Sequence, residues 1–127
     1  MNYLTLEEVI DIHELTIEVH GGSSAILSVG LVESAVEQAR QTFGGEPLYK
    51  SISEVAAAYW HSISSNHGFA DGNKRTAALA TAFFLRKNGY VLAMDDDEII
   101  ATGLAMAGQG MTRVEVFELV AKSVKRL

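Results

Sequence analysis

The segment His67–Arg75, with the sequence HGFADGNKR, interrupts the most apolar part of the chain. Its nine residues include an imidazole, a carboxylate, two glycines, an amide and two adjacent cations, and we refer to it as the polar turn. The flanking segments Val55–Ile63 and Ala78–Leu85 are rich in alanine and large apolar residues, so both are predicted to be helices. Since helices that are apolar on most faces are buried, we expect the polar turn to join two helices at the centre of the molecule.

The residue types of the polar turn favour phosphate as a ligand. A turn that opens a helix directs backbone N–H groups at one point, and the positive end of the helix dipole attracts an anion there. Gly72 allows the backbone to approach a ligand closely. Lys74 supplies a compact positive charge, and the guanidinium of Arg75 can donate two parallel hydrogen bonds to one phosphate. Asp71 is a residue type that binds Mg²⁺ together with phosphate oxygens.

Composition restricts the class of protein. The 127 residues suit one domain, 1–127, and 48% hydrophobic with 20% charged residues is ordinary for a globular chain. A net charge of -6 argues against a basic face for nucleic acid, so we expect no binding to DNA by this chain itself. The absence of cysteine excludes disulfides and suits a reducing compartment. The amino end does not resemble a signal peptide and no run reaches the roughly 18 apolar residues of a membrane span. We therefore expect a cytoplasmic protein with no membrane contact.

Helix signals recur along the chain and predict an all-α fold. Capping boxes at Thr5, Ser51 and Thr112 predict the starts of three helices. Glycine-containing stops at Gly21-Gly22, Gly44-Gly45 and Asn88-Gly89 predict the ends of the first, second and fourth helices. No segment shows a convincing strand alternation, and Tyr90–Ala93 is predicted to be a short apolar connector. We expect a compact bundle of six helices, over about 6–20, 31–42, 52–65, 73–88, 99–107 and 112–126, with a break at Gly108-Gln109-Gly110.

The segment Phe43–Lys50 holds the only proline of the chain and two of its glycines, which predicts a turn or short hairpin. Its residues Leu48 and Tyr49 are expected to be exposed. This segment directly precedes the helix that leads into the polar turn.

His67 permits two interpretations. A histidine at a helix end often only satisfies a backbone carbonyl, whereas an imidazole at a phosphate site can accept the proton of a hydroxyl group. Asp71 could likewise cap the following helix or hold a metal, and one carboxylate can do both. The remaining histidines, His13, His20 and His61, are predicted to be structural.

The polar turn resembles the motif of the Fic/Doc family, H-x-F-x-[DE]-G-N-[GK]-R. Every fixed position is present, namely His67, Phe69, Asp71, Gly72, Asn73, Lys74 and Arg75. The resemblance implies the Fic/Doc fold, with a central buried helix pair and a flap hairpin. The flap would comprise Gly45, Glu46, Pro47, Leu48 and Tyr49 and would hold a loop of the target protein.

The resemblance also implies a transfer reaction from ATP with Mg²⁺ to a protein hydroxyl group. His67 would be the general base and Asp71 the metal ligand. The Gly72 and Asn73 amides would form an anion hole, and Lys74 and Arg75 would bind the transferred phosphate. Arg86 corresponds to a further basic position of Doc-type members and is expected to contact the nucleotide.

Two activities occur in the resembled family. Most members that transfer AMP have Gly where this chain has Lys74 and a second Arg where it has Ala78. Doc-type toxins have the Lys, lack the second Arg, and act as kinases that phosphorylate a threonine of elongation factor Tu. Ser65 and Leu79 depart from the Arg and Asn of a Doc toxin. We therefore expect a kinase toxin first and an AMP transferase second, while an inactive peptide-binding module is the alternative from another class.

Self-inhibited members carry a glutamate followed by Gly or Asn, and no glutamate of this chain has such a neighbour. Inhibition is therefore expected to come from another chain, a small antitoxin whose C-terminal helix fills a groove of the toxin.

Overall fold

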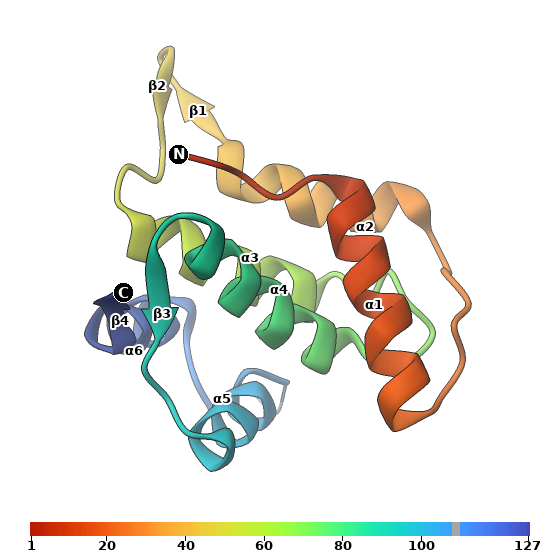
Figure 1. Ribbon diagram of the computed structural model, residues 1–127. Coiled ribbons are helices and arrows are strands. Elements are labelled where there is room, and N and C mark those ends of the chain that lie inside the picture. Colours follow the sequence, from red (N-terminus) through yellow and green to blue (C-terminus); the bar gives the residue numbers. More distant parts are fainter. Residues whose placement is uncertain (108–109) are drawn as a thin grey trace.

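Two helices, α3 (Ile52–Ser65) and α4 (Asn73–Lys87), form the centre of the computed structural model, which describes residues 1–107 and 110–127. In Figure 1 they lie side by side with the other helices arranged around them. Every residue of α3 from Val55 to Trp60 is buried, as its apolar sequence predicts. α4 differs from the prediction, because Leu79 and Phe83 on its outer face are 40% and 41% exposed.

The predicted capping boxes begin three of the helices. The side chains of Thr5, Ser51 and Thr112 each accept a hydrogen bond from the backbone N–H of the glutamate three residues later, at the starts of α1 (Leu6–His20), α3 and α6 (Arg113–Ser123). In return, the backbone N–H of each capping residue donates to the carboxylate of that glutamate. Asp95 and Glu98 exchange the same pair of bonds at the start of α5 (Asp96–Ala107), so the acidic residues before Ile99 open this helix. These local signals locate helix starts because each bond lies within one turn.

The second helix is shorter than predicted. α2 (Val29–Glu37) is capped by Ser28, whose side chain accepts from the Leu31 N–H, and a 3-10 turn, η1 (Gln38–Arg40), follows it. Thr42, predicted to be helical, instead belongs to β1 (Thr42–Phe43), which pairs with β2 (Glu46–Pro47). Gly44 and Gly45 between them have φ of 60° and 84°, the positive values that a two-residue hairpin turn requires. The hairpin is confirmed, and it projects from the helices in Figure 1.

The prediction for the carboxyl-terminal end was wrong in one respect. α6 ends at Ser123, and the segment β4 (Val124–Arg126) pairs antiparallel with β3 (Tyr90–Leu92), which the sequence suggested was only a connector. Gly89, with φ of 85°, turns the chain out of α4 into this strand. The partner of each strand lies more than thirty residues away, so neither strand shows a signal of its own.

α1 connects to both ends of α4. Near the start of α1, Glu8 forms an ion pair with Lys87 at 2.9 Å. Near its end, the hydroxyl oxygen of Thr16 lies 3.4 Å from the hydroxyl oxygen of Thr76. The two helices are therefore antiparallel, and the end of α1 lies beside the start of α4.

The described residues confirm a mostly helical fold with two small two-stranded sheets. None of their helices combines the length and the hydropathy needed to cross a bilayer. The predicted break at Gly108 and Gln109 lies outside the described residues. The elements in chain order are α1 Leu6–His20, α2 Val29–Glu37, η1 Gln38–Arg40, β1 Thr42–Phe43, β2 Glu46–Pro47, α3 Ile52–Ser65, α4 Asn73–Lys87, β3 Tyr90–Leu92, α5 Asp96–Ala107, α6 Arg113–Ser123 and β4 Val124–Arg126.

Candidate active site

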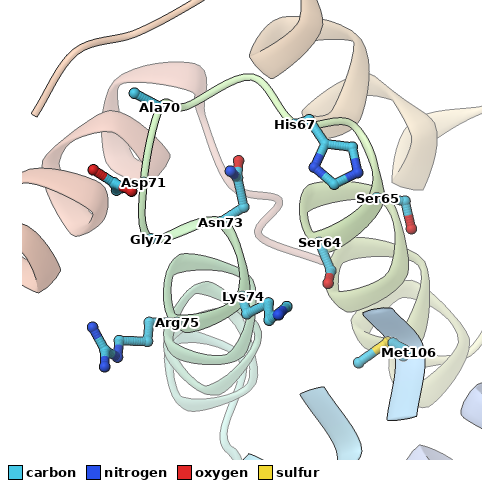
Figure 2. Close-up of a pocket in the computed structure, with 10 residues that line it drawn as sticks. All are labelled: Ser64, Ser65, His67, Ala70, Asp71, Gly72, Asn73, Lys74, Arg75 and Met106. Carbon is cyan, nitrogen blue, oxygen red and sulfur yellow. The ribbon is translucent and has the colours of Figure 1, made fainter. Parts of the chain in front are cut away.

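The polar turn forms one wall of a pocket of about 450 Å³ between the end of α3, the start of α4 and α5. Figure 2 shows its lining side chains. They are Ser64, Ser65, His67, Ala70, Asp71, Gly72, Asn73, Lys74, Arg75 and Met106. The candidate residues His67, Asp71, Gly72, Asn73, Lys74 and Arg75 of the polar turn thus all line one pocket.

His67 is exposed and has φ of 52°, in the left-handed region. Residues other than glycine seldom adopt this conformation, and they do so more often at functional sites. In Figure 2 its imidazole lies on the same side of the pocket as Ser64 and Ser65. His67 is therefore free to meet a ligand and is not turned into the core.

The backbone after His67 is held by a loop that the sequence left undefined. The Gly68 carbonyl accepts from the N–H groups of Leu27 at 2.9 Å and Ser28 at 3.2 Å, and the Ala70 N–H donates to the Ala25 carbonyl at 3.0 Å. A Cβ on Gly68 would lie 2.5 Å from a methyl group of Val32, so only glycine fits there. These bonds attach the polar turn to the segment between α1 and α2.

Asn73 closes the polar turn on itself. Its side-chain oxygen accepts from the Phe69 N–H at 3.2 Å, and its side-chain nitrogen donates to the Phe69 carbonyl at 2.9 Å. Phe69 is 2% exposed and fixes the turn to the core. The amide of Asn73 is thus committed to the loop, and the contact expected of this residue with a nucleotide falls to its backbone N–H.

The start of α4 differs from the starts of α1, α3 and α6. Its N-cap is Gly72, in the left-handed conformation with φ of 80°, and among the described residues no side chain caps the first amides of the helix. The interpretation of Asp71 as the cap was therefore wrong. Unsatisfied amides at the positive end of a helix dipole are an anion site, and the residues at this helix start, Gly72, Asn73 and Lys74, line the pocket.

Asp71 is bound at two points on the side of α1. Its carboxylate oxygen Oδ2 accepts from the Ser23 N–H at 2.8 Å, and its carbonyl lies 2.8 Å from His13 Nε2. In Figure 2 the carboxylate extends away from His67. Neither Ser23 nor His13 was identified from the sequence as part of the site, because the partners lie 48 and 58 residues from Asp71 in the chain.

The oxygen atoms of the polar turn could bind Mg²⁺ only if a phosphate group supplied further ligands. The described residues contain no group of three or more histidine and carboxylate side chains that could hold a metal. Mg²⁺ in nucleotide sites is commonly bound by one or two carboxylates, phosphates and water. Asp71 can supply one oxygen, since Oδ2 alone is bound to Ser23.

Lys74 and Arg75 are both exposed and line the pocket, but they do not converge. In Figure 2 Lys74 extends toward Met106, on the side of His67, whereas Arg75 extends the opposite way, on the side of Asp71. Consecutive helix residues point in different directions, so the expectation of two cations on one phosphate is not met in this arrangement. Within the described part of the chain, neither forms an ion pair.

Arg86 does not reach the pocket. It lies in the last turn of α4, about 16 Å along the helix axis from Arg75, and is absent from the pocket lining. The structure therefore gives no support to its predicted nucleotide contact.

The predicted flap also lies apart from the pocket. Gly45, Glu46, Pro47, Leu48 and Tyr49 precede the start of α3, whereas His67 follows its end, about 20 Å along the axis. Leu48 is exposed as expected, but Tyr49 is 7% exposed, so the prediction was wrong for it. Its ring lies 5.5 Å from that of Phe117, and the Arg113 guanidinium lies over both rings.

Comparison with known proteins identifies the family. The model described as "Fic/DOC family" matches residues 3–85, which include the whole polar turn and end one residue before Arg86. The chain is 37% identical over 95 residues to Toxin Doc of Mycolicibacterium smegmatis, which covers 75% of this chain and 71% of that protein. It is 31% identical over 99 residues to Protein kinase doc of Escherichia phage P1, with 78% and 77% covered. The chain therefore belongs to the Fic/DOC family.

Proposed function

We propose that this chain is the toxin of a toxin-antitoxin pair and acts as an ATP-dependent protein kinase. The observation that carries the proposal is the pocket itself, in which His67 lies beside the uncapped start of α4. The names of two relatives, Toxin Doc and Protein kinase doc, support both parts of the statement. The target is a serine or threonine hydroxyl group of a translation factor resembling elongation factor Tu, and the reaction takes place in the cytoplasm.

In this reaction the target hydroxyl oxygen attacks the γ-phosphorus of ATP. The bond from that phosphorus to the oxygen bridging the β- and γ-phosphates breaks, and ADP leaves. His67 accepts the hydroxyl proton as general base. The amides of Gly72 and Asn73 and the ammonium of Lys74, which lies on the side of His67, neutralise charge on the transferring group. Mg²⁺, held by Asp71, would neutralise charge on the phosphates when bound.

AMP transfer is the second candidate. Lys74 and Arg75 extend to opposite sides in Figure 2, so they do not bind one phosphate group together, as selection of the γ-phosphate by both cations would require. In this case the hydroxyl group attacks the α-phosphorus and pyrophosphate leaves. The same base and the same amides would serve either reaction.

The deciding experiment measures the intact mass of a candidate target after incubation with ATP and Mg²⁺. A gain of about 80 Da identifies phosphate and about 329 Da identifies AMP. ATP labelled at the α- or γ-phosphate gives an independent assignment. The same sample with His67→Ala is the control, and we expect it to transfer at least about a hundredfold less.

Absence of any transfer by the wild-type chain to translation factors would contradict the proposal. An inactive binding module would then be indicated if His67→Ala stayed as toxic as the wild type. Loss of toxicity in that variant, with partner binding retained, excludes the module.

We also propose where the antitoxin binds. A groove of about 330 Å³ between α4 and α5 is lined by apolar side chains, with Lys74 and Arg75 where it meets the pocket. Leu79, Ile100 and Leu104 in this groove are each at least 40% exposed. An amphipathic helix with an acidic residue at one end would cover these side chains and pair with the cations, which would block the pocket.

This proposal predicts the effect of Leu104→Asp on inhibition. A buried carboxylate opposes an apolar partner, so a co-expressed antitoxin that restores growth with the wild-type toxin should fail with this variant, which should remain toxic. Val114→Asp is the matched control, because Val114 is 65% exposed against 59% for Leu104 but lies on α6, outside the groove. Rescue of Leu104→Asp as complete as that of Val114→Asp would place the antitoxin elsewhere.

A further inference from the structure

We propose that His13 is a positioning residue for this site, which aims the Gly72 amide at the phosphate. The proposal rests on the proposed function for its importance in catalysis, but its geometric part can be tested separately. It begins from a residue that the sequence suggested was only structural.

His13 lies on α1 and is fully buried beneath the polar turn. Its ring stacks on that of Phe69, with centroids 3.8 Å apart and planes 8° from parallel. Its Nε2 lies 2.8 Å from the Asp71 carbonyl oxygen. A carbonyl can only accept, so Nε2 carries the hydrogen in this bond.

The bond determines the direction of the next amide. A trans peptide is planar, and its C=O and N–H point in opposite directions. Asp71 and Gly72 share one peptide, and the described chain has no cis bond. With the Asp71 carbonyl held toward α1, the Gly72 N–H must point away from α1, on the side where Gly72 lines the pocket.

The packing behind Gly72 supports the same direction. A Cβ on Gly72 would lie 3.3 Å from Ile17, 3.4 Å from the Thr16 hydroxyl and 3.7 Å from His13 Cδ2. α1 therefore fills the space behind the turn, and the peptide cannot move back. The amide of Gly72 is thus preorganised, which is what an anion hole requires.

The other ring nitrogen of His13, Nδ1, is buried and has no partner within the described residues. A structural histidine would be expected to satisfy both nitrogens. Here the nitrogen that faces the polar turn is the one with a protein partner, so the Asp71–Gly72 peptide is the polar contact of the ring.

The test compares His13→Phe, which keeps the stacked ring but loses the donor, with His13→Gln, whose amide nitrogen can reach the same oxygen. Val9→Ala is the control for a change in the same buried face of α1, one turn away from the bond. Binding of inorganic phosphate is followed through the Gly72 amide signal in ¹H–¹⁵N spectra. We expect about tenfold weaker binding for His13→Phe, recovery to within about threefold for His13→Gln, and no change for Val9→Ala.

Nitrogen shifts of the His13 ring in the wild type give a second measurement, and we expect the hydrogen on Nε2. Equal phosphate binding by His13→Phe and Val9→Ala, or a hydrogen on Nδ1 alone, would overturn the proposal. If His13→Phe does not fold, His13→Asn takes its place, since its shorter amide does not reach Asp71.

The same variants separate this inference from the proposed function. Where the wild type transfers a group to a protein, kcat should fall about ten- to a hundredfold in His13→Phe and recover in His13→Gln. Where the wild type transfers nothing, the proposed function fails, and the phosphate titration still decides the role of His13.

Discussion

Asn73 shows how a residue of a family motif can act within the turn and not on the ligand. Its two side-chain atoms bond both backbone groups of Phe69. The type of the residue was predictable from the motif, but its orientation was not. The Phe69 backbone becomes an available partner only once the turn has closed.

The bonds of Asn73 make Asn73→Asp an informative variant. An aspartate can still accept from the Phe69 N–H but cannot donate to its carbonyl, so we expect a loss of about 1 kcal/mol in the free energy of unfolding. Urea unfolding at pH 7 measures it, and Asn73→Ala should lose more because both bonds disappear. Equal stability of wild type and Asn73→Ala would show that the bonds are not formed in solution.

His61 should make the stability of the folded chain depend on pH. Its burial on α3 lowers its pKa from the ordinary value of 6.5. The unfolded chain therefore binds a proton at higher pH than the folded chain. The contribution of His61 to stability is complete above about pH 6.5 and is lost as the pH falls below this value.

Melting temperatures of the wild type and His61→Gln, measured in steps from pH 8 to pH 5, test this dependence. The wild type should lose more stability than the variant over the acidic steps. Parallel curves would show that His61 does not cause the acid sensitivity.

At the scale of elements, the hairpin of β1 and β2 is separate from the pocket and has its own exposed side chains. Phe43 is 84% exposed and Leu48 is 47% exposed, while Tyr49 belongs to the core. The double variant Phe43→Asp with Leu48→Asp therefore tests target binding without disturbing the fold. We expect KM for the protein target to rise several-fold and KM for ATP to stay unchanged.

The control for the hairpin is Tyr49→Asp, which should unfold the protein because it buries a carboxylate beside Phe117. Steady-state kinetics at saturating ATP, with the concentration of the protein target varied, measures KM for the target. An unchanged KM for the target would remove the hairpin from the binding surface.

The elements also show what a single sequence can predict. Helix starts at Thr5, Ser51 and Thr112 were found because a capping box lies within four residues. β3 and β4 were missed because each depends on a partner in a distant part of the chain. The loop of residues 23–28 was left open for the same reason, since it is held by carbonyl and carboxylate oxygens of the polar turn.

At the scale of the whole molecule, Tyr59 connects the amino-terminal segment to the central helix. Its hydroxyl oxygen accepts from the Leu4 N–H at 2.9 Å, across 55 positions of sequence. Burial raises the pKa of Tyr59 to about 12. Its contribution to stability is therefore present below about pH 10 and is lost as the pH rises toward 12.

Tyr59→Phe should cost about 1–3 kcal/mol in the free energy of unfolding, because the Leu4 N–H would be left without a partner in the core. Urea unfolding at neutral pH measures this loss. The wild type should also unfold more readily between pH 10 and 12. A neutral-pH stability equal to that of the wild type would mean that water reaches the Leu4 amide.

Because the start of α4 has no side-chain cap, a ligand bound there should raise the melting temperature of the protein. An oxyanion that settles on the free amides completes the first turn of the helix, and any compound that binds only the folded chain raises its melting temperature. Thermal screening of nucleotides and phosphorylated metabolites would then rank the anions that this helix start binds.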